Sequence, residues 1–308
     1  MITVGDLALT AVVDPRRGAK ILSLRDAGGV EWLAQAEPSA DGLRGKAFVD
    51  AEMAGWDECA PTIVTCRVDD HDLPDHGDLW DIPFDVETDG TTVTAVGSSL
   101  RYRLRRGIRA TETGLRLEYE VTALRGAVPF LWAAHPQFIA PPGTRVELDG
   151  GGTGVMRVVD VMDPALPELI WSEDLASIDT VPPTGYRKLY AHPEQPVHGA
   201  RLVRADGSAL ALSWSAECPY VGLWFDRAAF SREPVIAIEP ATAYFDALDT
   251  AIRLNRVPFV SPRRPLRWWV EVTAQPVARP PQPSARRNRV APVDAETLTP
   301  RTSSPAPG

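Results

Sequence analysis

Hydrophobic and polar residues alternate with a period of two along several stretches of the chain. One face of residues 115–121, of 208–215 and of 266–272 is apolar, formed in turn by Leu115, Leu117, Tyr119 and Val121, by Leu210, Leu212 and Trp214, and by Trp268, Val270 and Val272. In the first stretch Arg116, Glu118 and Glu120 occupy the opposite face. This alternation is typical of half-buried strands in antiparallel sheets.

Turn-forming residues separate the predicted strands. Glycine follows aspartate at 89–90 and 206–207, and longer glycine-containing turns are predicted at 26–29 and 149–152. Helical periodicity is scarce, and the 29 prolines would interrupt long helices. The pattern predicts one large all-β domain over residues 1–275, built of two layered antiparallel sheets with few short helices.

The composition changes near residue 275, after a last strand predicted at 266–274. Residues 276–308 are rich in Pro, Arg, Ser, Ala and Thr. Such a segment buries too little apolar surface to fold, so we predict a disordered C-terminal tail.

The 308-residue chain is acidic, with a formal net charge of −9, and 44% of its residues are hydrophobic. The negative charge argues against binding to nucleic acid or to anionic membrane surfaces. No run of about 18 apolar residues and no basic leader followed by an apolar run is present in the sequence. The three cysteines lack CxxC spacing, which favours reduced thiols. We therefore expect a soluble cytoplasmic protein, a monomer or homodimer, with neither a nucleic-acid nor a membrane partner.

Three separate segments supply groups that could move protons on a sugar ring. His76 lies in the segment 73–80, His135 in 131–138 and Glu239 in 237–248. Two imidazoles and one carboxylate are sufficient for acid–base chemistry at a hemiacetal, because each can exchange a proton near neutral pH. The order His, His, Glu, each in a strand-like context, is the most informative feature of the chain.

Each of these residues also has an ordinary structural interpretation. His76, between Asp75 and Gly77, could be a solvated turn histidine, and His135 could be a satisfied core residue in an apolar strand. Glu239 ends a run of aliphatic residues, where a carboxylate is costly unless it is functional or caps an arginine. Burial would raise the pKa of Glu239 toward neutrality, which suits a general base.

Aromatic and acidic residues near these segments are candidates for sugar contacts. Indole rings cover the apolar face of a sugar, and carboxylates accept hydrogen bonds from its hydroxyl groups. The predicted substrate-binding residues are Trp56, Asp57, Glu58, Trp80, Phe138, Trp224 and Asp226. In a surface turn, the segment 55–61 would be equally ordinary.

Other chemistries lack support in the sequence. Residues 150–154 are glycine-rich but lack the Gly-Lys-Ser/Thr ending of a phosphate-binding loop, and they predict a hairpin turn. Cys59 has no local support as a nucleophile. No His-x-His or HExxH spacing is present, so no metal site is predicted.

The ordered segments resemble bacterial aldose 1-epimerases of the galactose mutarotase-like superfamily over residues 1–275. The segments that carry the resemblance are 18–33, 55–58 with 75–80, His135–Pro136, and 238–240 with Asp246. The resemblance implies a large antiparallel β-supersandwich that binds a free hexose and needs no metal or organic cofactor. It assigns Glu239 as general base, His135 as general acid and His76 as the donor that orients O1 and O5.

Two features of the family are absent here. Trp56-Asp57-Glu58 replaces its Asn-Arg pair, and residues 185–188 lie where a substrate-binding aspartate is expected. Asp75, Asp78 and Asp81 near His76 would repel a phosphate, so we expect an unphosphorylated sugar. Two other functions remain open: a non-catalytic carbohydrate-binding protein on the same scaffold, and a lyase or a glycosidase with two carboxylates.

Overall fold

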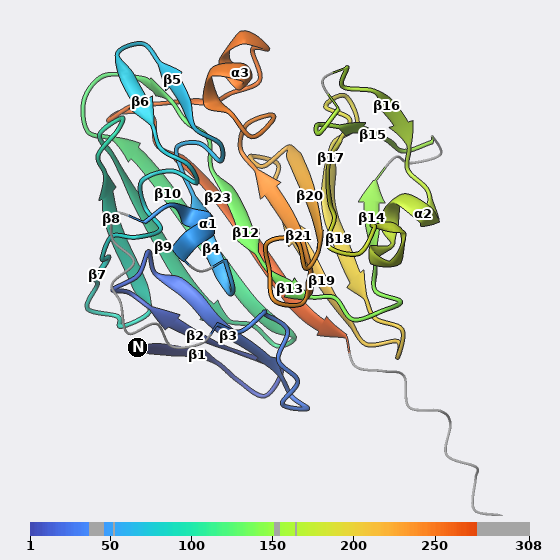
Figure 1. The fold of residues 1–308 in the computed structure, drawn as a ribbon. Coiled ribbons are helices and arrows are strands. Elements are labelled where there is room, and N and C mark those ends of the chain that lie inside the picture. Colours follow the sequence, from blue (N-terminus) through green and yellow to red (C-terminus); the bar gives the residue numbers. More distant parts are fainter. Residues whose placement is uncertain (37–45, 52, 151–154, 164, 276–308) are drawn as a thin grey trace, which may run out of the picture. The chain divides into compact units, whose positions relative to one another are not determined.

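The computed structural model describes residues 1–36, 46–51, 53–150, 155–163 and 165–275. Within these residues the chain forms two large sheets, one of eleven strands and one of eight (Figure 1). Every strand pairing among the described residues is antiparallel. The all-β prediction is therefore confirmed. The predicted tail, residues 276–308, lies outside the described residues.

The eleven-stranded sheet carries the candidate site. In spatial order its strands are β1 (Ile2–Gly5), β2 (Leu9–Asp14), β3 (Lys20–Asp26), β4 (Trp56–Cys59), β12 (Ala133–Pro136), β21 (Pro234–Ala241), β20 (Tyr220–Arg227), β17 (Tyr186–Ala191), β15 (Arg157–Asp160) and β16 (Glu168–Ile170). The short strand β13 (Phe138–Ile139) also pairs with β21. Strands from four distant parts of the chain therefore meet at the centre of this sheet.

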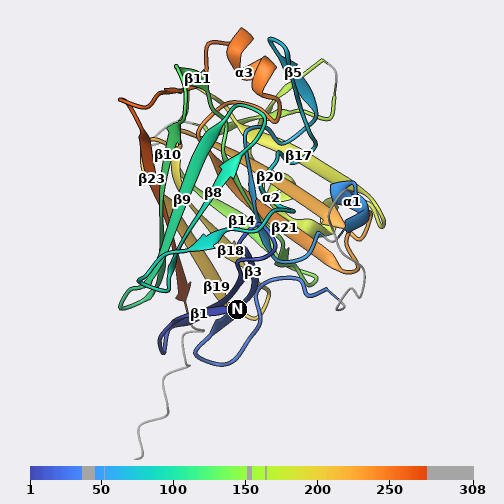
Figure 2. The ribbon, with the colours of Figure 1, turned by 90° about the vertical axis from the view of Figure 1, so that its left-hand side faces the viewer.

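The eight-stranded sheet forms the second layer. Its strands are, in order, β14 (Arg145–Gly150), β18 (Val197–Val203), β19 (Ala209–Trp214), β23 (Leu266–Gln275), β10 (Gly114–Ala123), β9 (Tyr102–Ala110), β8 (Thr92–Gly97) and β7 (Asp85–Val86). Of these strands, β8, β9, β10 and β23 lie to the left of β20 and β21 in Figure 2. Two small pairs complete the strands: β5 (Cys66–Val68) with β6 (His71–Leu73), and β11 (Val128–Pro129) with β22 (Phe259–Val260).

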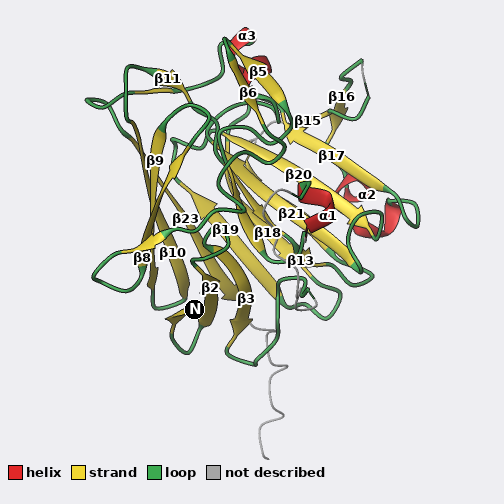
Figure 3. Ribbon diagram, turned by 60° about the vertical axis from the view of Figure 1, so that its left-hand side comes forward, coloured by secondary structure: helices red, strands yellow, loops and turns green. Residues whose placement is uncertain are grey.

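Helices are few and short, as predicted. They are α1 (Phe48–Ala51), α2 (Glu173–Ala176), α3 (Leu248–Arg253) and a 3₁₀ turn at Ile178–Thr180. Helix α1 lies over the larger sheet, with its Phe48 ring 5.6 Å from the His135 ring of β12 (Figure 3). Among the described residues no helix has the length and apolar character needed to span a bilayer.

The alternating segments of the sequence form the strands that it predicts. Leu115, Leu117, Tyr119 and Val121 of β10 are buried, as are the apolar faces of β19 and β23. On the opposite face, Arg116 and Glu120 pair with Glu271 and Arg267 of the neighbouring strand at 3.2 and 2.6 Å. The turns at 26–29, 89–90 and 206–207 also fall between strands. Residues 151–154 of the glycine-rich segment are outside the described part.

A buried polar cluster joins the two sheets. Glu58 of β4 is fully buried and accepts hydrogen bonds from Arg106 of β9 at 2.6 Å, from the Tyr119 hydroxyl at 3.1 Å and from the Trp132 indole at 2.7 Å. Arg106 also donates to the Ala19 carbonyl. These four hydrogen bonds hold a buried ion pair, so removal of either Glu58 or Arg106 would cost roughly 3–5 kcal/mol.

Candidate active site

The central strands of the larger sheet bring the candidate residues onto one face. In the pairing of β4 with β12, His135 lies opposite Asp57 and Ala133 opposite Cys59. In the pairing of β12 with β21, Ala133 lies opposite Ala241, two residues from Glu239, and in that of β20 with β21 Gly222 lies opposite Glu239. Since side chains of directly opposed residues share a face, and every second residue of a strand returns to that face, the register places Asp57, Cys59, His135 and Glu239 together.

Glu239 is fully buried and paired with a lysine. Its Oε2 accepts a hydrogen bond from Lys188 Nζ of β17, and that ammonium also lies 3.4 Å from Asp246 Oδ1. Tyr190 donates its hydroxyl to the same Asp246 oxygen at 2.6 Å. The other carboxylate oxygen of Glu239 has no hydrogen-bond partner and lies 3.9 Å from His135 Nε2. The cation beside Glu239 is thus a lysine, where the sequence suggested an arginine as the structural alternative.

Gly222 makes room for this ion pair. A Cβ atom at position 222 would lie 2.9 Å from Glu239 Oε2 and 3.1 Å from Tyr190 Cζ. Any larger residue on β20 would therefore displace the carboxylate or the tyrosine ring. The absence of a side chain at position 222 leaves the space that the buried Glu239–Lys188 pair occupies.

Burial controls the proton affinity of these groups. It raises the pKa of Glu239 above the usual 4.5, although Lys188 opposes the shift. It disfavours the ammonium of Lys188, but Asp246 and Glu239 outweigh that effect and the pKa of Lys188 is raised. Burial, together with nearby His76 and Lys188, holds the pKa of His135 well below 6.5. At neutral pH His135 is therefore a neutral imidazole.

The two histidines are in contact across the site. Their ring centroids are 5.1 Å apart, and the Phe48 ring of α1 stacks on His76 at 3.7 Å. His76 Nδ1 lies 3.0 Å from Asp75 Oδ2, close enough for an ion pair, but the angle is too poor for a hydrogen bond. The His76 ring is therefore held by stacking on Phe48, beside the Asp75 carboxylate.

The backbone after β4 fixes the position of His76. His76 N–H donates to the Ile63 carbonyl at 2.5 Å, and Asp78 N–H donates to the Ala60 carbonyl at 2.9 Å. Gly77 has a φ of +78°, and a Cβ there would lie 1.9 Å from the Ala60 oxygen. Only glycine allows this approach, so the loop that carries His76 is locked against the end of β4.

A cavity of about 320 Å³ opens over these groups. Its polar lining consists of Asp75, His76, His135, Lys188 and Asp246, and aromatic rings of Phe48, Tyr186, Trp224 and Phe230 line the rest together with aliphatic side chains. The centroid of Tyr186 lies 5.1 Å from those of Trp224 and Phe230, so the three rings form one wall. Such a wall suits the apolar face of a sugar ring, and the polar groups suit its hydroxyls.

Some predicted site residues converge on this cavity. His76, His135 and Trp224 line it. Glu239 does not, because its side chain lies beneath Lys188 and His135, in contact with the first and 3.9 Å from the second. Glu239 and the two histidines are close together, as predicted. The Glu239 carboxylate, however, lies below the cavity surface, where it cannot contact a bound sugar directly.

Several predicted sugar contacts need correction. Glu58 points to the opposite face of β4, where it belongs to the buried cluster between the sheets. Trp56 and Phe138 are buried with their rings edge to face. Trp80 lies behind Phe48 with its ring edge-on at 5.3 Å, outside the cavity lining. Strand alternation turns Trp56 and Glu58 of β4 away from the face that carries His135, and Trp80 lies in a turn.

Two predicted acidic contacts instead have positioning roles. Asp57 pairs with Lys20 at 3.0 Å, and both side chains are buried. Asp226 is fully buried and accepts backbone hydrogen bonds from Ala229, Phe230 and Ser231. It thereby holds the loop that presents Phe230 to the cavity, without lining the cavity itself.

Lys188, Tyr186 and Asp246 are site residues that sequence reasoning did not select. Lys188 follows Arg187 in a strand with mixed character, and nothing in its local pattern distinguishes a buried lysine from an exposed one. Asp246 lies in the segment that resembles the family, so it could have been found there. Cys59 also faces the site, where burial first and then Asp57 and Glu239 raise the pKa of its thiol, as expected of an unreactive cysteine.

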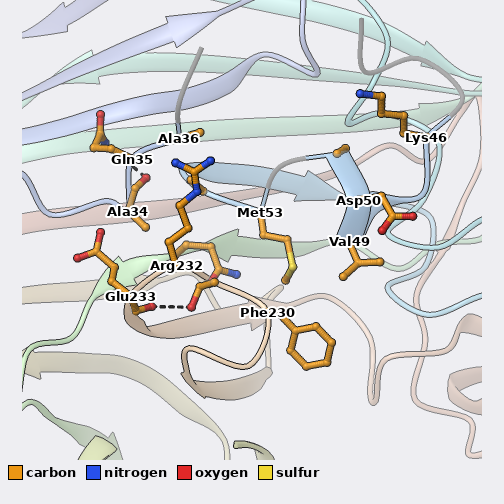
Figure 4. A pocket seen from close by; sticks show the side chains of 14 residues that line it. Ala34, Gln35, Ala36, Lys46, Val49, Asp50, Met53, Phe230, Arg232 and Glu233 are labelled. Carbon is orange, nitrogen blue, oxygen red and sulfur yellow. Dashed lines mark hydrogen bonds between the residues drawn. The ribbon is translucent and has the colours of Figure 1, made fainter. Parts of the chain in front are cut away.

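A second cavity of about 410 Å³ lies next to the first (Figure 4). The two share Val49, Met53 and Phe230 as a common wall. Gln35, Arg232 and Glu233 provide polar groups here. In the close-up, Arg232 and Glu233 extend from the loop that also carries Phe230. The shared side chains of Val49, Met53 and Phe230 therefore separate the two spaces.

No family model and no curated protein matches the sequence. Solved structures do match over most of their length. The Slr1438 protein from Synechocystis sp. PCC 6803 aligns with a TM-score of 0.67 at 15% identity, covering 89% of this chain and 94% of that one. A candidate aldose 1-epimerase from Escherichia coli K12 aligns with a TM-score of 0.66 at 15% identity, covering 89% and 98%.

A galactose mutarotase-like protein from Lactobacillus casei ATCC 334 aligns with a TM-score of 0.62 at 19% identity, covering 89% of this chain and all of that one. At such identities the likeness concerns the fold alone. The chain therefore has the galactose mutarotase-like fold that its sequence segments resemble.

Proposed function

We propose that this protein is an aldose 1-epimerase that interconverts the α and β anomers of a free hexose. The observation that carries the proposal is the convergence of three distant segments: His76 and His135 line one cavity with an aromatic wall, and Glu239 lies beneath them, 3.9 Å from His135. The reaction needs a base for the C1 hydroxyl and an acid for the ring oxygen, and these groups supply both.

In the proposed reaction, Glu239 removes the proton from the C1 hydroxyl while the ring oxygen O5 receives a proton. The C1–O5 bond breaks, and C1 becomes an aldehyde. Rotation about C1–C2 and the reverse proton transfers then close the ring from the other face. No atom is gained or lost, and the enzyme returns to its starting protonation state.

The surroundings of the two histidines favour different roles for them in the reaction. Because burial keeps the pKa of His135 well below 6.5, a neutral His135 serves best as a hydrogen-bond donor to O5. His76 lines the cavity and its side chain is 15% exposed, so it is the imidazole that can exchange the transferred proton with solvent. We therefore assign the acid to His76 and the orienting role to His135, the reverse of what the family resemblance implies.

Glu239 needs a conformational step before it can reach a sugar. Lys188 lines the cavity and contacts Glu239 Oε2, whereas Glu239 is fully buried. A bound hydroxyl must therefore displace the ammonium, which keeps Asp246 as its second partner at 3.4 Å. Glu239 Oε1, which has no hydrogen-bond partner, is the oxygen available to the C1 hydroxyl.

The cavity favours a neutral sugar. Asp75 and Asp246 line it, and their charges would repel a phosphate group close to His76. Asp78, which the sequence placed in the same group, is turned toward Tyr102 and the Ser99 backbone, both at 2.6 Å. The repulsion therefore comes from Asp75 and Asp246.

Polarimetry of freshly dissolved α-glucose and α-galactose tests the proposal. We expect wild-type protein to accelerate mutarotation, and Glu239→Gln to lower the rate by about 10²–10⁴-fold while sugar binding remains measurable. Glu58→Gln is the matched control, because it changes an equally buried glutamate on the far face of the sheet. Equal rates for wild type and Glu239→Gln at the same folded fraction would remove the proposed mechanism.

The contact between Glu239 and Lys188 also supports a second candidate function. If the ammonium is never displaced, the same cavity would bind a sugar without turning it over, as a carbohydrate-binding protein. Saturable binding by titration calorimetry with mutarotation no faster than in buffer would favour that function over catalysis.

A further inference from the structure

Three atoms of the metal-binding type meet at and beneath the floor of the cavity. The Cys59 sulfur and one ring nitrogen each from His76 and His135 all lie within 4.8 Å of one another. Cys59 and His135 are buried, and the His76 side chain is 15% exposed. The proposed sugar chemistry uses both imidazoles but gives the thiol no role.

The backbone fixes this triangle of donors. Cys59 and His135 are on the same face of adjacent strands, two positions apart in the β4–β12 register. His76 is brought beside them because Gly77 and Asp78 are locked against Ala60, the residue after Cys59. The three donors therefore come from two sheet strands and one anchored loop, an arrangement rigid enough to preorganise a small ion.

The charges around the triangle favour a cation. The nearby ionised groups are the carboxylates of Asp57, Glu58, Asp75, Glu239 and Asp246 and the cations of Lys20, Arg106 and Lys188. Five negative against three positive charges leave a formal balance of −2 before any thiolate forms. Glu239 Oε1, fully buried and without a hydrogen-bond partner, points toward His135 and is available as a further oxygen ligand.

We propose that Cys59, His76 and His135 bind a divalent cation of the zinc class. Thiolate and imidazole are the ligands that Zn²⁺ prefers, whereas Mg²⁺ and Ca²⁺ prefer oxygen. Zn–S bonds of about 2.3 Å and Zn–N bonds of about 2.0 Å put tetrahedral ligand atoms roughly 3.3–3.6 Å apart. Side-chain movements of about 1 Å would close the observed triangle to that size. A sugar hydroxyl, a water or Glu239 completes the coordination.

This site escapes a search for short metal motifs. The sequence contains no His-x-His or HExxH spacing, and residues 59, 76 and 135 are far apart along the chain.

Zinc bound at this site would inhibit the proposed reaction. Because Zn²⁺ would occupy a nitrogen of each imidazole, bound zinc should block the proposed proton transfers, and a chelator should restore them.

Cobalt substitution tests the site without relying on activity. Full-length protein, treated with a chelator and then desalted, is titrated with Co²⁺ and followed by absorption. We expect a thiolate-to-cobalt charge-transfer band that saturates at one ion per chain and disappears when Zn²⁺ is added. Cys59→Ser should abolish the band and weaken zinc binding at least about tenfold. Cys66→Ser is the matched control, since the Cys66 sulfur contacts Thr62 at 3.4 Å and is outside the triangle.

His76→Ala is a second test variant in case Cys59→Ser fails to fold. It should fold, because His76 lies in a loop and is partly exposed. It should weaken zinc binding to a similar extent with an unchanged circular dichroism spectrum. Absence of a charge-transfer band in wild type, or retention of the band in folded Cys59→Ser, would overturn the site. Saturable zinc binding with undiminished mutarotation would support the site and remove the catalytic roles of the histidines, so the two proposals fail separately.

Discussion

Replacing Lys188 by methionine isolates the group that sets the charge of Glu239. The two side chains have similar length, and methionine fits a buried strand position. The variant removes the ammonium that contacts Glu239 Oε2 and lies 3.4 Å from Asp246. Glu239, with no exposed surface, is left without its counter-ion, and burial then raises its pKa further than in wild type.

The cost of this substitution depends on pH. Removing one partner of a buried ion pair costs roughly 3–5 kcal/mol when the other partner stays charged. Glu239 can instead take up a proton, so we expect about 3 kcal/mol at pH 8. A carboxyl whose folded pKa is raised binds more protons folded than unfolded, and stability then falls as pH rises. At pH 5, where the variant's Glu239 is protonated, the difference should shrink to about 1 kcal/mol or less.

Urea unfolding at pH 5 and pH 8 measures this dependence, and the pH profile of mutarotation measures its effect on the base. The acid limb of the profile should move to higher pH, with activity at pH 6 reduced at least about tenfold and recovering as pH rises. Lys20→Met is the control, because it removes an equally buried lysine whose partner is Asp57. A stability loss that is the same at both pH values, or an acid limb shared with wild type, would refute the role given to Lys188.

Two further substitutions examine neighbouring groups. The folded pKa of His135 is well below its unfolded value of 6.5, so the unfolded chain binds more protons below that pH. Wild-type stability should therefore fall as pH drops from 7 toward 5, by up to about 1.4 kcal/mol per pH unit. His135→Gln should flatten this slope in urea titrations. Gly222→Ala should lower stability by about 1–3 kcal/mol and slow mutarotation, because its Cβ would lie 2.9 Å from Glu239 Oε2. Gly107→Ala is the control: the nearest atom to its Cβ would be the Thr92 hydroxyl at 3.3 Å, so stability and mutarotation rate should change little. A normal rate in Gly222→Ala would mean that the carboxylate position is uncritical.

The architecture was predictable because it follows from local rules. Strand alternation at residues 115–121, 208–215 and 266–272 gave both the strands and their buried faces, and aspartate–glycine pairs gave the turns. The strand predicted at 266–274 is β23, Leu266–Gln275. These features depend on residues within a few positions of one another, and a single sequence contains that information.

The side-chain environment of the site was less predictable because it depends on register between distant strands. Asp57 and Glu58 are adjacent acidic residues with the same apparent suitability for sugar contact. Once β4 pairs with β12, Asp57 shares a face with His135 and Glu58 faces Arg106 of the other sheet. A change of one residue in register would exchange them. Nothing in residues 55–61 fixes that choice.

Lys188 connects the two proposals made for the cavity. With the ammonium in place, the Glu239 charge is compensated, and the floor holds neutral His135, the Cys59 thiol and one unpartnered carboxylate oxygen. A sugar that displaces Lys188 toward Asp246 would free Glu239 as a base, whereas a zinc ion would recruit the thiol and both imidazoles. The two events compete for the same imidazole nitrogens, so Lys188→Met should affect them oppositely. At pH 8, where Glu239 of the variant is ionised, loss of a nearby positive charge should tighten zinc binding, whereas at lower pH the raised pKa of Glu239 leaves the base protonated and slows mutarotation.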